Sequence, residues 1–191
     1  MTFRGLSDSS APTFEIRLAS LADAEELHAV AAETFPMACP PGSTVENVAA
    51  FIAENLSERV FQHQLVDPAR TILLVESDGR AIGYSMLDAM EPSDPDVAAA
   101  VTGRPTVELS KFYVLASGHG RGIAMALMAD TLEQAAWRGA ASVWLGVNEK
   151  NARANRFYDK CGFETVGMKR FQLGDNWEND FVMERTLSQA L

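Results

Sequence analysis

Cysteine and histidine are scarce in this sequence. The chain has two cysteines, Cys39 and Cys161, and three histidines among its 191 residues. The cysteines form no CxxC pair, and neither of them falls in a local zinc-binding pattern with a histidine. The sequence therefore predicts no metal site and a reduced, cytoplasmic protein.

Positive charge is also in short supply. Sixteen Lys and Arg residues stand against 26 Asp and Glu residues, which gives a formal net charge of -10. A surface with this average charge repels phosphate backbones and anionic lipid headgroups, so neither nucleic acid nor a membrane is expected as a partner. The same field favours cationic ligands, although an acidic surface also keeps a protein soluble.

Internal repeats and low-complexity blocks are absent. Residues 1–12 contain a Ser-rich run and no apolar segment, so we expect a flexible tail there rather than a signal peptide or membrane anchor. Hydrophobic residues make up 47% and charged residues 22% of the chain, as in globular proteins. We expect a single domain over residues 13–191.

The spacing of apolar residues predicts an α/β fold with a mixed sheet. Strands are expected at residues 14–18, 71–76, 81–87, 106–114, 142–147, 163–168 and 180–186, with a hairpin turn at Asp78-Gly79. Helices are expected at residues 20–35, with a capping box from Ser20 to Asp23 and an end before Pro36, and at 43–57, 123–137 and 152–160. The stretch 91–105, rich in proline and acidic residues, is expected to be a loop.

A Gly-rich turn lies between the strand at 106–114 and the helix at 123–137. Glycines let the backbone bring bare amide groups close to an anion, and the following helix adds the positive end of its dipole. The turn suits a pyrophosphate, although a purely structural turn has a similar pattern. Dinucleotide and P-loop motifs are excluded, because Ile123 and Met125 stand where G-x-G-x-x-G needs its last Gly and no G-K-[ST] occurs.

This turn resembles the Q/R-x-x-G-x-G/A signature of the GNAT superfamily of N-acetyltransferases, which closes over the pyrophosphate of coenzyme A. The signature is read here, with His in place of Gln or Arg, as His119, Gly120, Arg121, Gly122, Ile123 and Ala124. A second stretch, from Asn151 to Tyr158 and on to Gly162-Phe163, is similar to the family's N-x-x-A-x-x-F-Y helix leading into G-F. Two motifs in the family's order support each other.

The likeness covers residues 14–187 and includes features similar to bacterial spermidine/spermine acetyltransferases. It implies acetyl-CoA as cosubstrate and a GNAT-like, mostly antiparallel sheet of six to seven strands flanked by helices. The strands at 106–114 and 142–147 would splay apart to admit the pantetheine arm. The coenzyme contacts that the resemblance implies are Val114, whose N–H would face the thioester carbonyl, His119, Gly120, Arg121, Gly122, Ile123, Ala124, Asn151 and Tyr158.

Two catalytic residues follow from the same resemblance. An alkyl ammonium, with a pKa near ~10.4, must lose a proton before its nitrogen can attack. Glu108 resembles the glutamate base of some family members, with ordered water or a purely solvated glutamate as alternatives, and strand alternation places it on one face with Ser110 and Phe112. Tyr158 would protonate the leaving thiolate, and no Ser or Cys has the partners of an acyl-enzyme nucleophile.

The expected acceptor is a small primary amine, and the net charge and the resemblance favour a cationic polyamine such as spermidine. Acidic residues that could line its approach are Asp88, Glu91, Asp94, Asp96, Asp175, Glu178 and Asp180. Protein N-termini and aminoglycosides are the alternative acceptors. A non-catalytic acyl-CoA sensor is the alternative to an enzyme, and the sequence leaves open whether the chain forms a homodimer.

Overall fold

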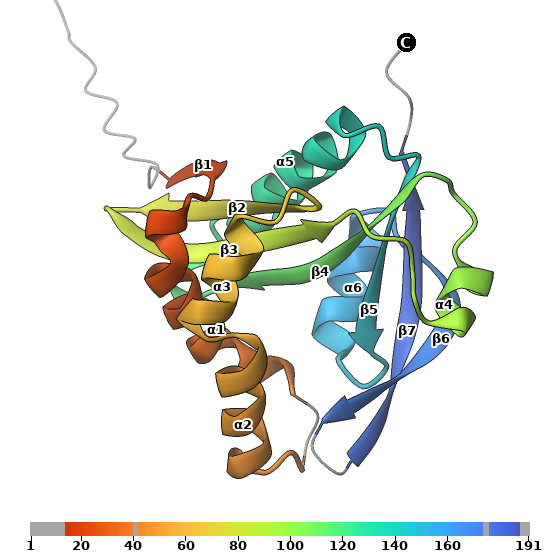
Figure 1. Cartoon of the computed structure of the whole chain (residues 1–191), viewed down its shortest axis with the longest axis horizontal. Helices are drawn as coiled ribbons and strands as arrows, with labels where there is room; N and C mark the ends of the chain where they lie inside the picture. The colour runs from red at the N-terminus through yellow and green to blue at the C-terminus, as the bar shows by residue number, and fades with distance from the viewer. Residues whose placement is uncertain (1–13, 40–41, 174–175, 188–191) are drawn as a thin grey trace, which may run out of the picture.

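Within residues 14–39, 42–173 and 176–187, which the computed structural model describes, seven strands form one sheet (Figure 1). The strands are β1 Phe14–Leu18, β2 Arg70–Ser77, β3 Arg80–Asp88, β4 Thr106–Val114, β5 Ser142–Asn148, β6 Glu164–Leu173 and β7 Asn176–Thr186, in the sheet order β1-β2-β3-β4-β5-β7-β6. Every neighbouring pair is antiparallel except β4 and β5, which are parallel. The predicted mixed, mostly antiparallel sheet is confirmed.

Helices cover both faces of this sheet (Figure 1). Their bounds are α1 Ala24–Ala38, α2 Val45–Asn55, α3 Glu58–Leu65, α4 Pro95–Ala100, α5 Ile123–Trp137 and α6 Ala152–Lys160, with 3-10 turns at Leu21–Asp23 and Ala116–Gly118. Helices α1 to α3 lie on one face, and α5 and α6 lie on the other (Figure 1). None of the helices in the described part of the chain is long and apolar enough to cross a membrane.

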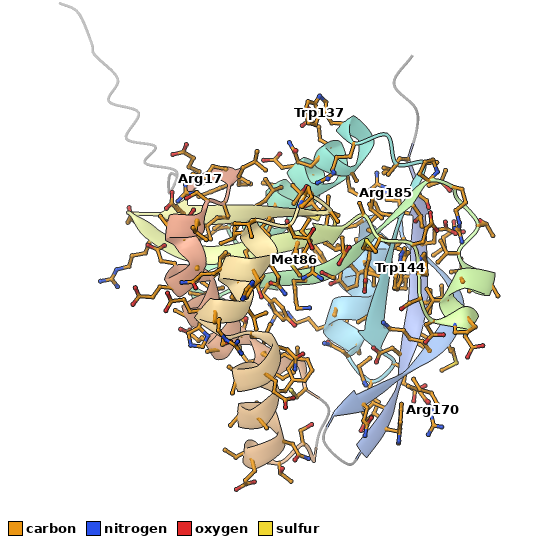
Figure 2. The ribbon with its side chains drawn as sticks, in the orientation of Figure 1. Arg17, Met86, Trp137, Trp144, Arg170 and Arg185 are labelled. Atoms are coloured by element: carbon orange, nitrogen blue, oxygen red, sulfur yellow. The ribbon has the colours of Figure 1, made fainter. Side chains whose placement is uncertain are left out.

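Each face has its own buried cluster. Leu27 of α1 and Phe61 of α3 pack on Tyr84 and Met86 of β3, where Figure 2 shows Met86 near the middle of the molecule. The clusters on the other face are centred on apolar side chains of α5, β3, β4 and β5. Each large side chain buried in this way stabilises the fold by about 1.5 to 3 kcal/mol.

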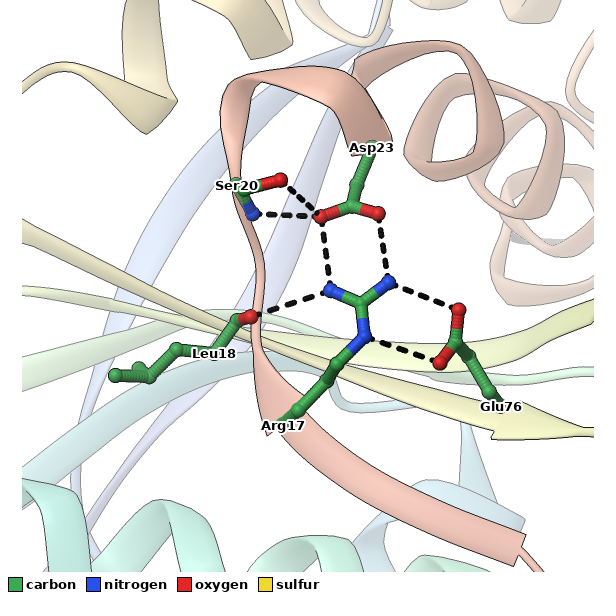
Figure 3. Close-up of polar contacts among 5 residues, drawn as sticks. All are labelled: Arg17, Leu18, Ser20, Asp23 and Glu76. Carbon is green, nitrogen blue, oxygen red and sulfur yellow. Dashed lines mark hydrogen bonds and ion pairs between the residues drawn. The ribbon is translucent and has the colours of Figure 1, made fainter.

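Arg17 of β1 joins the first strand to the start of α1 (Figure 3). Its guanidinium donates to both carboxylate oxygens of Asp23, at 2.7 and 2.9 Å, and to both of Glu76 on β2, at 2.8 and 3.0 Å. The Asp23 carboxylate also accepts from the Ser20 N–H at 2.6 Å, within the predicted capping box. The hydrogen bonds from Arg17 hold the pKa of Asp23 well below its usual range.

Four predictions for the helices are corrected by the structure. Helix α1 does not stop before Pro36 but includes it, because a proline near a helix end removes few backbone hydrogen bonds. The cap of α2 is Thr44 rather than Ser43, and its Oγ accepts from the Asn47 N–H at 3.2 Å. Helix α3 was not expected, and α4 lies within the stretch predicted as a loop. Asp94 caps α4 by accepting from the backbone two residues on.

Candidate active site

Strands β4 and β5 are paired only at their first residues. The parallel ladder joins Thr106–Glu108 to Ser142–Trp144 and no further, although β4 continues to Val114 and β5 to Asn148. The predicted splay between these strands is therefore present. Two cavities lie at this opening, of about 200 and 300 Å³.

The smaller of the two, called here the glycine-turn cavity, is formed by α1, the end of β4, the Gly-rich turn and α6. Its lining residues are Thr34, Met37, Ala38, Phe112, Tyr113, Val114, His119, Ala124, Asn151, Arg153, Ala154, Phe157 and Tyr158. The predicted coenzyme contacts Val114, His119, Ala124, Asn151 and Tyr158 are thus brought together. Gly120, Arg121, Gly122 and Ile123 belong to the same turn without lining the cavity itself.

The backbone of the turn is left-handed at two glycines. Gly120 and Gly122 have φ values of 75° and 78°, in the left-handed region that favours glycine. Gly122 directly precedes α5, and a β-carbon built on either glycine would meet no atom within 4 Å. The space on the side-chain side of both glycines is therefore open, next to the positive end of a 15-residue helix. Ile123 is fully buried and packs in the core cluster that contains Leu127.

The side chains of Arg121 and His119 have protein partners. Arg121 donates to the Ser77 Oγ at 3.1 Å and so reaches toward the end of β2. His119 Nε2 lies 3.1 Å from the carbonyl oxygen of Val114 and 2.9 Å from Nη2 of Arg153. The nitrogen donates to the carbonyl in one tautomer or accepts from the arginine in the other. The sequence reasoning missed Arg153, which places a permanent cation on the glycine-turn cavity.

Two residues of α6 are placed by local structure. The Oδ1 of Asn151 accepts from the Ala154 N–H at 3.1 Å and caps the helix, a contact worth about 1 kcal/mol. Tyr158 is held by Phe112, Phe157 and Phe163, with ring centroids 5.5 to 6.4 Å from its own. Burial raises the pKa of Tyr158, so its phenol keeps its proton at neutral pH.

A β-bulge in β4 corrects the predicted face of Glu108. Lys111 pairs with Met86 and Leu109 with Leu87, which leaves Ser110 as an extra residue in the ladder. The alternation shifts by one residue there, so Glu108 does not share a face with Phe112. Glu108 lies instead on the same face as Lys111, toward α1.

The larger cavity, called here the charged cavity, lies on this face. Four acidic or basic side chains line it from three strands: Glu108 and Lys111 of β4, Lys169 of β6 and Asp180 of β7. The other lining residues are Phe35, Ala38, Cys39, Phe51, Leu109, Ser110, Phe112, Tyr113, Gly146, Val147, Asn148, Asn151, Ala154 and Tyr158. Among the described residues, no group of three or more His, Cys, Asp or Glu is placed to hold a metal ion.

Burial shifts the pKa values of three of these groups. It raises the pKa of the Glu108 carboxyl, an effect that nearby Lys169 and Lys111 oppose. It also raises the pKa of Asp180 to about 6, again against the attraction of Lys169. Burial lowers the pKa of the Lys111 ammonium, because burial disfavours the charged form of each group.

Most of the acidic residues expected near the acceptor have other partners. Asp88 pairs with Arg70 at 3.1 Å, Glu91 with Arg104 at 3.5 Å and Glu178 with Lys150 at 3.0 Å. Asp94 and Asp96 belong to the cap and first turn of α4, and Asp175 lies outside the described residues. Of the six acids that the structure describes, Asp180 alone lines the charged cavity.

Comparisons with known proteins agree on one family. A model of the acetyltransferase (GNAT) family matches residues 26–163. An uncharacterized N-acetyltransferase of Mycobacterium tuberculosis is 49% identical over 167 residues, which cover 87% of this chain and 99% of the relative.

Solved structures show the same fold at lower identity. The PaiA N-acetyltransferase of Thermoplasma acidophilum, in complex with coenzyme A, matches with a TM-score of 0.74 and 22% identity over 92% of this chain and 99% of its own. The acetyltransferase yncA of Salmonella typhimurium, with its cofactor acetyl-CoA, has a TM-score of 0.63 and 19% identity over 94% and 96%. The chain therefore belongs to the GNAT family of acetyltransferases.

Proposed function

We propose that the protein transfers the acetyl group of acetyl-CoA directly to the primary amine of a small molecule. The observation that carries this proposal is the junction of the two cavities. Phe112, Tyr113 and Tyr158 line both of them, together with Ala38, Asn151 and Ala154. A thioester held in the glycine-turn cavity and an amine held in the charged cavity would meet beside the Tyr158 ring.

The residues on the coenzyme side fit a pyrophosphate. The space that a side chain would occupy at Gly120 and Gly122 is open, and the N-terminus of α5 favours negative charge there. Arg153 adds a cation to a chain with a net charge of -10. The Val114 N–H, at the end of β4, is proposed to donate to the thioester carbonyl oxygen.

The residues of the charged cavity supply proton transfer. Glu108 takes a proton from the acceptor ammonium, directly or through water, and the freed nitrogen forms a bond to the acetyl carbon. The carbon–sulfur bond then breaks, and the Tyr158 phenol gives its proton to the leaving sulfur. The second proton that the nitrogen loses as the amide forms passes to water, and water returns a proton to the Tyr158 phenolate. The acetyl group passes in one ternary complex, so no acyl-enzyme is needed.

For the acceptor, the polyamine predicted from the sequence has mixed support. The net charge of -10, Glu108 and Asp180 favour a cation. The five other expected acids that the structure describes do not line the charged cavity, and Lys111 and Lys169 place two positive groups inside it. Spermidine is therefore one member of the panel that must be tested, beside aminoglycosides and peptide N-termini.

The test is a screen of amines for release of coenzyme A, combined with calorimetry of acetyl-CoA binding. We expect acetyl-CoA to bind with at least micromolar affinity and at least one class of amine to be acetylated. Binding without acetylation of any amine would favour the acyl-CoA sensor instead. Absence of binding by folded protein would contradict both functions.

A further inference from the structure

The charged cavity contains two ammonium groups whose attraction to Glu108 and Asp180 acts at a distance rather than through a direct ion pair. In the described part of the chain, neither Lys111 nor Lys169 has an ion pair within 4.0 Å. The Lys111 Nζ donates to the carbonyl oxygen of Ser110 at 3.3 Å, and the Lys169 Nζ lies 5.3 Å from the centre of the Trp144 ring. Both ammoniums line a cavity of about 300 Å³.

Placing Lys111 in this cavity is costly for the protein alone. Lys111 is half-buried, so its ammonium loses part of its hydration, and one hydrogen bond does not replace it. The lowered pKa of Lys111 reflects the same loss of hydration. A ligand that brings negative charge to this position would offset the desolvation.

The backbone also makes room for Lys169. A side chain built at position 146 would collide with the arm of Lys169, so the glycine there lets this lysine lie across β5. The ammonium thereby reaches the face of Trp144, on the same side of the sheet as Glu108. Lys169 comes from β6, which is separated from β5 by β7, and still contributes to the charged cavity.

The balance of charge argues against a polycation. Glu108 and Asp180 can contribute two negative charges, and Lys111 and Lys169 contribute two positive charges. A ligand with several ammoniums finds no surplus of negative charge in such a cavity. A ligand with one ammonium and one anionic group can pair its ammonium with a carboxylate and its anionic group with a lysine.

On the basis of the proposed acetyl transfer, we propose that the acceptor carries an anionic group, a carboxylate or a phosphate, a few atoms from its reactive amine. Lys111 and Lys169 bind the anionic group, while Glu108 and Asp180 face the amine. The cavity volume, at the small end of the roughly 300 to 1,000 Å³ typical of ligand pockets, fits a molecule of amino-acid size.

The experiment compares matched pairs of acceptors that differ in the anionic group. Amino acids are measured against their methyl esters and phosphoethanolamine against ethanolamine, with spermidine and a peptide amide in the same panel. We expect kcat/KM to be about 10- to 100-fold higher for the anionic member of the preferred pair, because each lysine contributes a charge-assisted hydrogen bond. The pair with the larger difference in kcat/KM shows whether the cavity prefers a carboxylate or a phosphate.

Variants connect this preference to the two lysines. Lys111→Met and Lys169→Met, on different strands, should each reduce the ratio of kcat/KM for the anionic member of the pair to kcat/KM for the neutral member. Lys160→Met, an exposed lysine of α6 outside both cavities, is the matched control and should keep the full ratio. Equal rates within every pair, or a preference for spermidine or the peptide, would overturn the proposal.

A binding measurement separates this proposal from the proposed function. The anionic amines are titrated by calorimetry into protein saturated with coenzyme A, which has no acetyl group to transfer. Binding that is weakened in both lysine variants supports the proposal even if no amine is acetylated. If none of the anionic amines binds, the proposal is wrong, whatever the rates show.

Discussion

At the scale of single residues, Tyr158 has the position and the proton that an acid for the leaving thiolate needs. Its ring lines both cavities, and three aromatic rings fix its orientation. Because burial raises its pKa, the phenol stays protonated up to alkaline pH. These properties do not depend on a bound ligand.

Replacing Tyr158 by Phe should lower kcat by ~10- to 1,000-fold, because the phenol acts in the step in which sulfur leaves. The aromatic packing is retained, so acetyl-CoA should bind to Tyr158→Phe with nearly the affinity of the wild type. Single-turnover kinetics and calorimetry measure the two effects separately. A wild-type rate of the chemical step would remove Tyr158 from the mechanism.

Replacing Glu108 by Gln should reduce kcat/KM most strongly near neutral pH. The loss should shrink as the pH rises, because more of the amine then arrives without its proton. Burial raises the pKa of Glu108, so in the wild type the acid limb should lie above the usual glutamate range. Profiles of kcat/KM against pH test this, and a loss that is constant with pH would contradict the role of base.

The sequence identified residues of the site that belong to local motifs and missed those that depend on distant pairing. The glycines before α5 and the tyrosine of the N-x-x-A-x-x-F-Y motif on α6 can each be recognised within a short stretch of sequence. Lys169 reaches Trp144 only because β6, β7 and β5 lie side by side, and Lys111 joins Glu108 only because of the bulge at Ser110. Neither the strand order nor the bulge can be read from the spacing of apolar residues in the sequence.

At the scale of elements, strands were predicted better than the helices around α1. Alternating and β-branched residues with turns between them mark the strands. Helix α3 was missed because Phe61 is its only fully buried residue in a short, polar segment. The 3-10 turn and the helix start are fixed by Arg17 and Asp23, and the second partner of Arg17, Glu76, comes from another strand.

The turn before α5 gives the prediction at this scale. Gly122→Val should weaken acetyl-CoA binding by at least ~10-fold, because a branched side chain would enter the open space beside the N-terminus of α5. Gly139→Val is the matched control: Gly139 also has a positive φ, 82°, but lies beyond the end of α5.

Both valines carry backbone strain of about 1 to 3 kcal/mol, so the two variants should lose similar stability. Calorimetry should find reduced affinity in Gly122→Val alone. Undiminished binding by folded Gly122→Val would show that the turn does not hold the coenzyme.

At the scale of the whole molecule, the site lowers the stability of the fold that carries it. Asp180 is 8% exposed, and burial raises its pKa to about 6. The folded state therefore binds a proton more tightly than the unfolded chain, in which the pKa is about 3.9. Ionised Asp180 therefore lowers the stability of the folded state. This loss of stability is absent below the pKa of the unfolded chain and fully present above pH 6.

Asp180→Asn should consequently raise the free energy of unfolding by about 1 to 3 kcal/mol at pH 8 and have little effect at pH 4. Urea denaturation at the two pH values measures this difference. The exposed Asp159→Asn serves as the control and should change the stability little at either pH. A loss of stability at pH 8 in Asp180→Asn would mean that the attraction of Lys169 outweighs the desolvation.

The early end of the β4–β5 ladder has a consequence for hydrogen exchange. Beyond Glu108 and Trp144 the facing edges of the two strands lack each other as partners, although β3 and β7 still pair with their outer edges. Amides on the inner edges should exchange with deuterium faster than those on the outer edges of the same strands. Slower exchange at the inner edges on addition of coenzyme A would mark where the ligand completes the sheet.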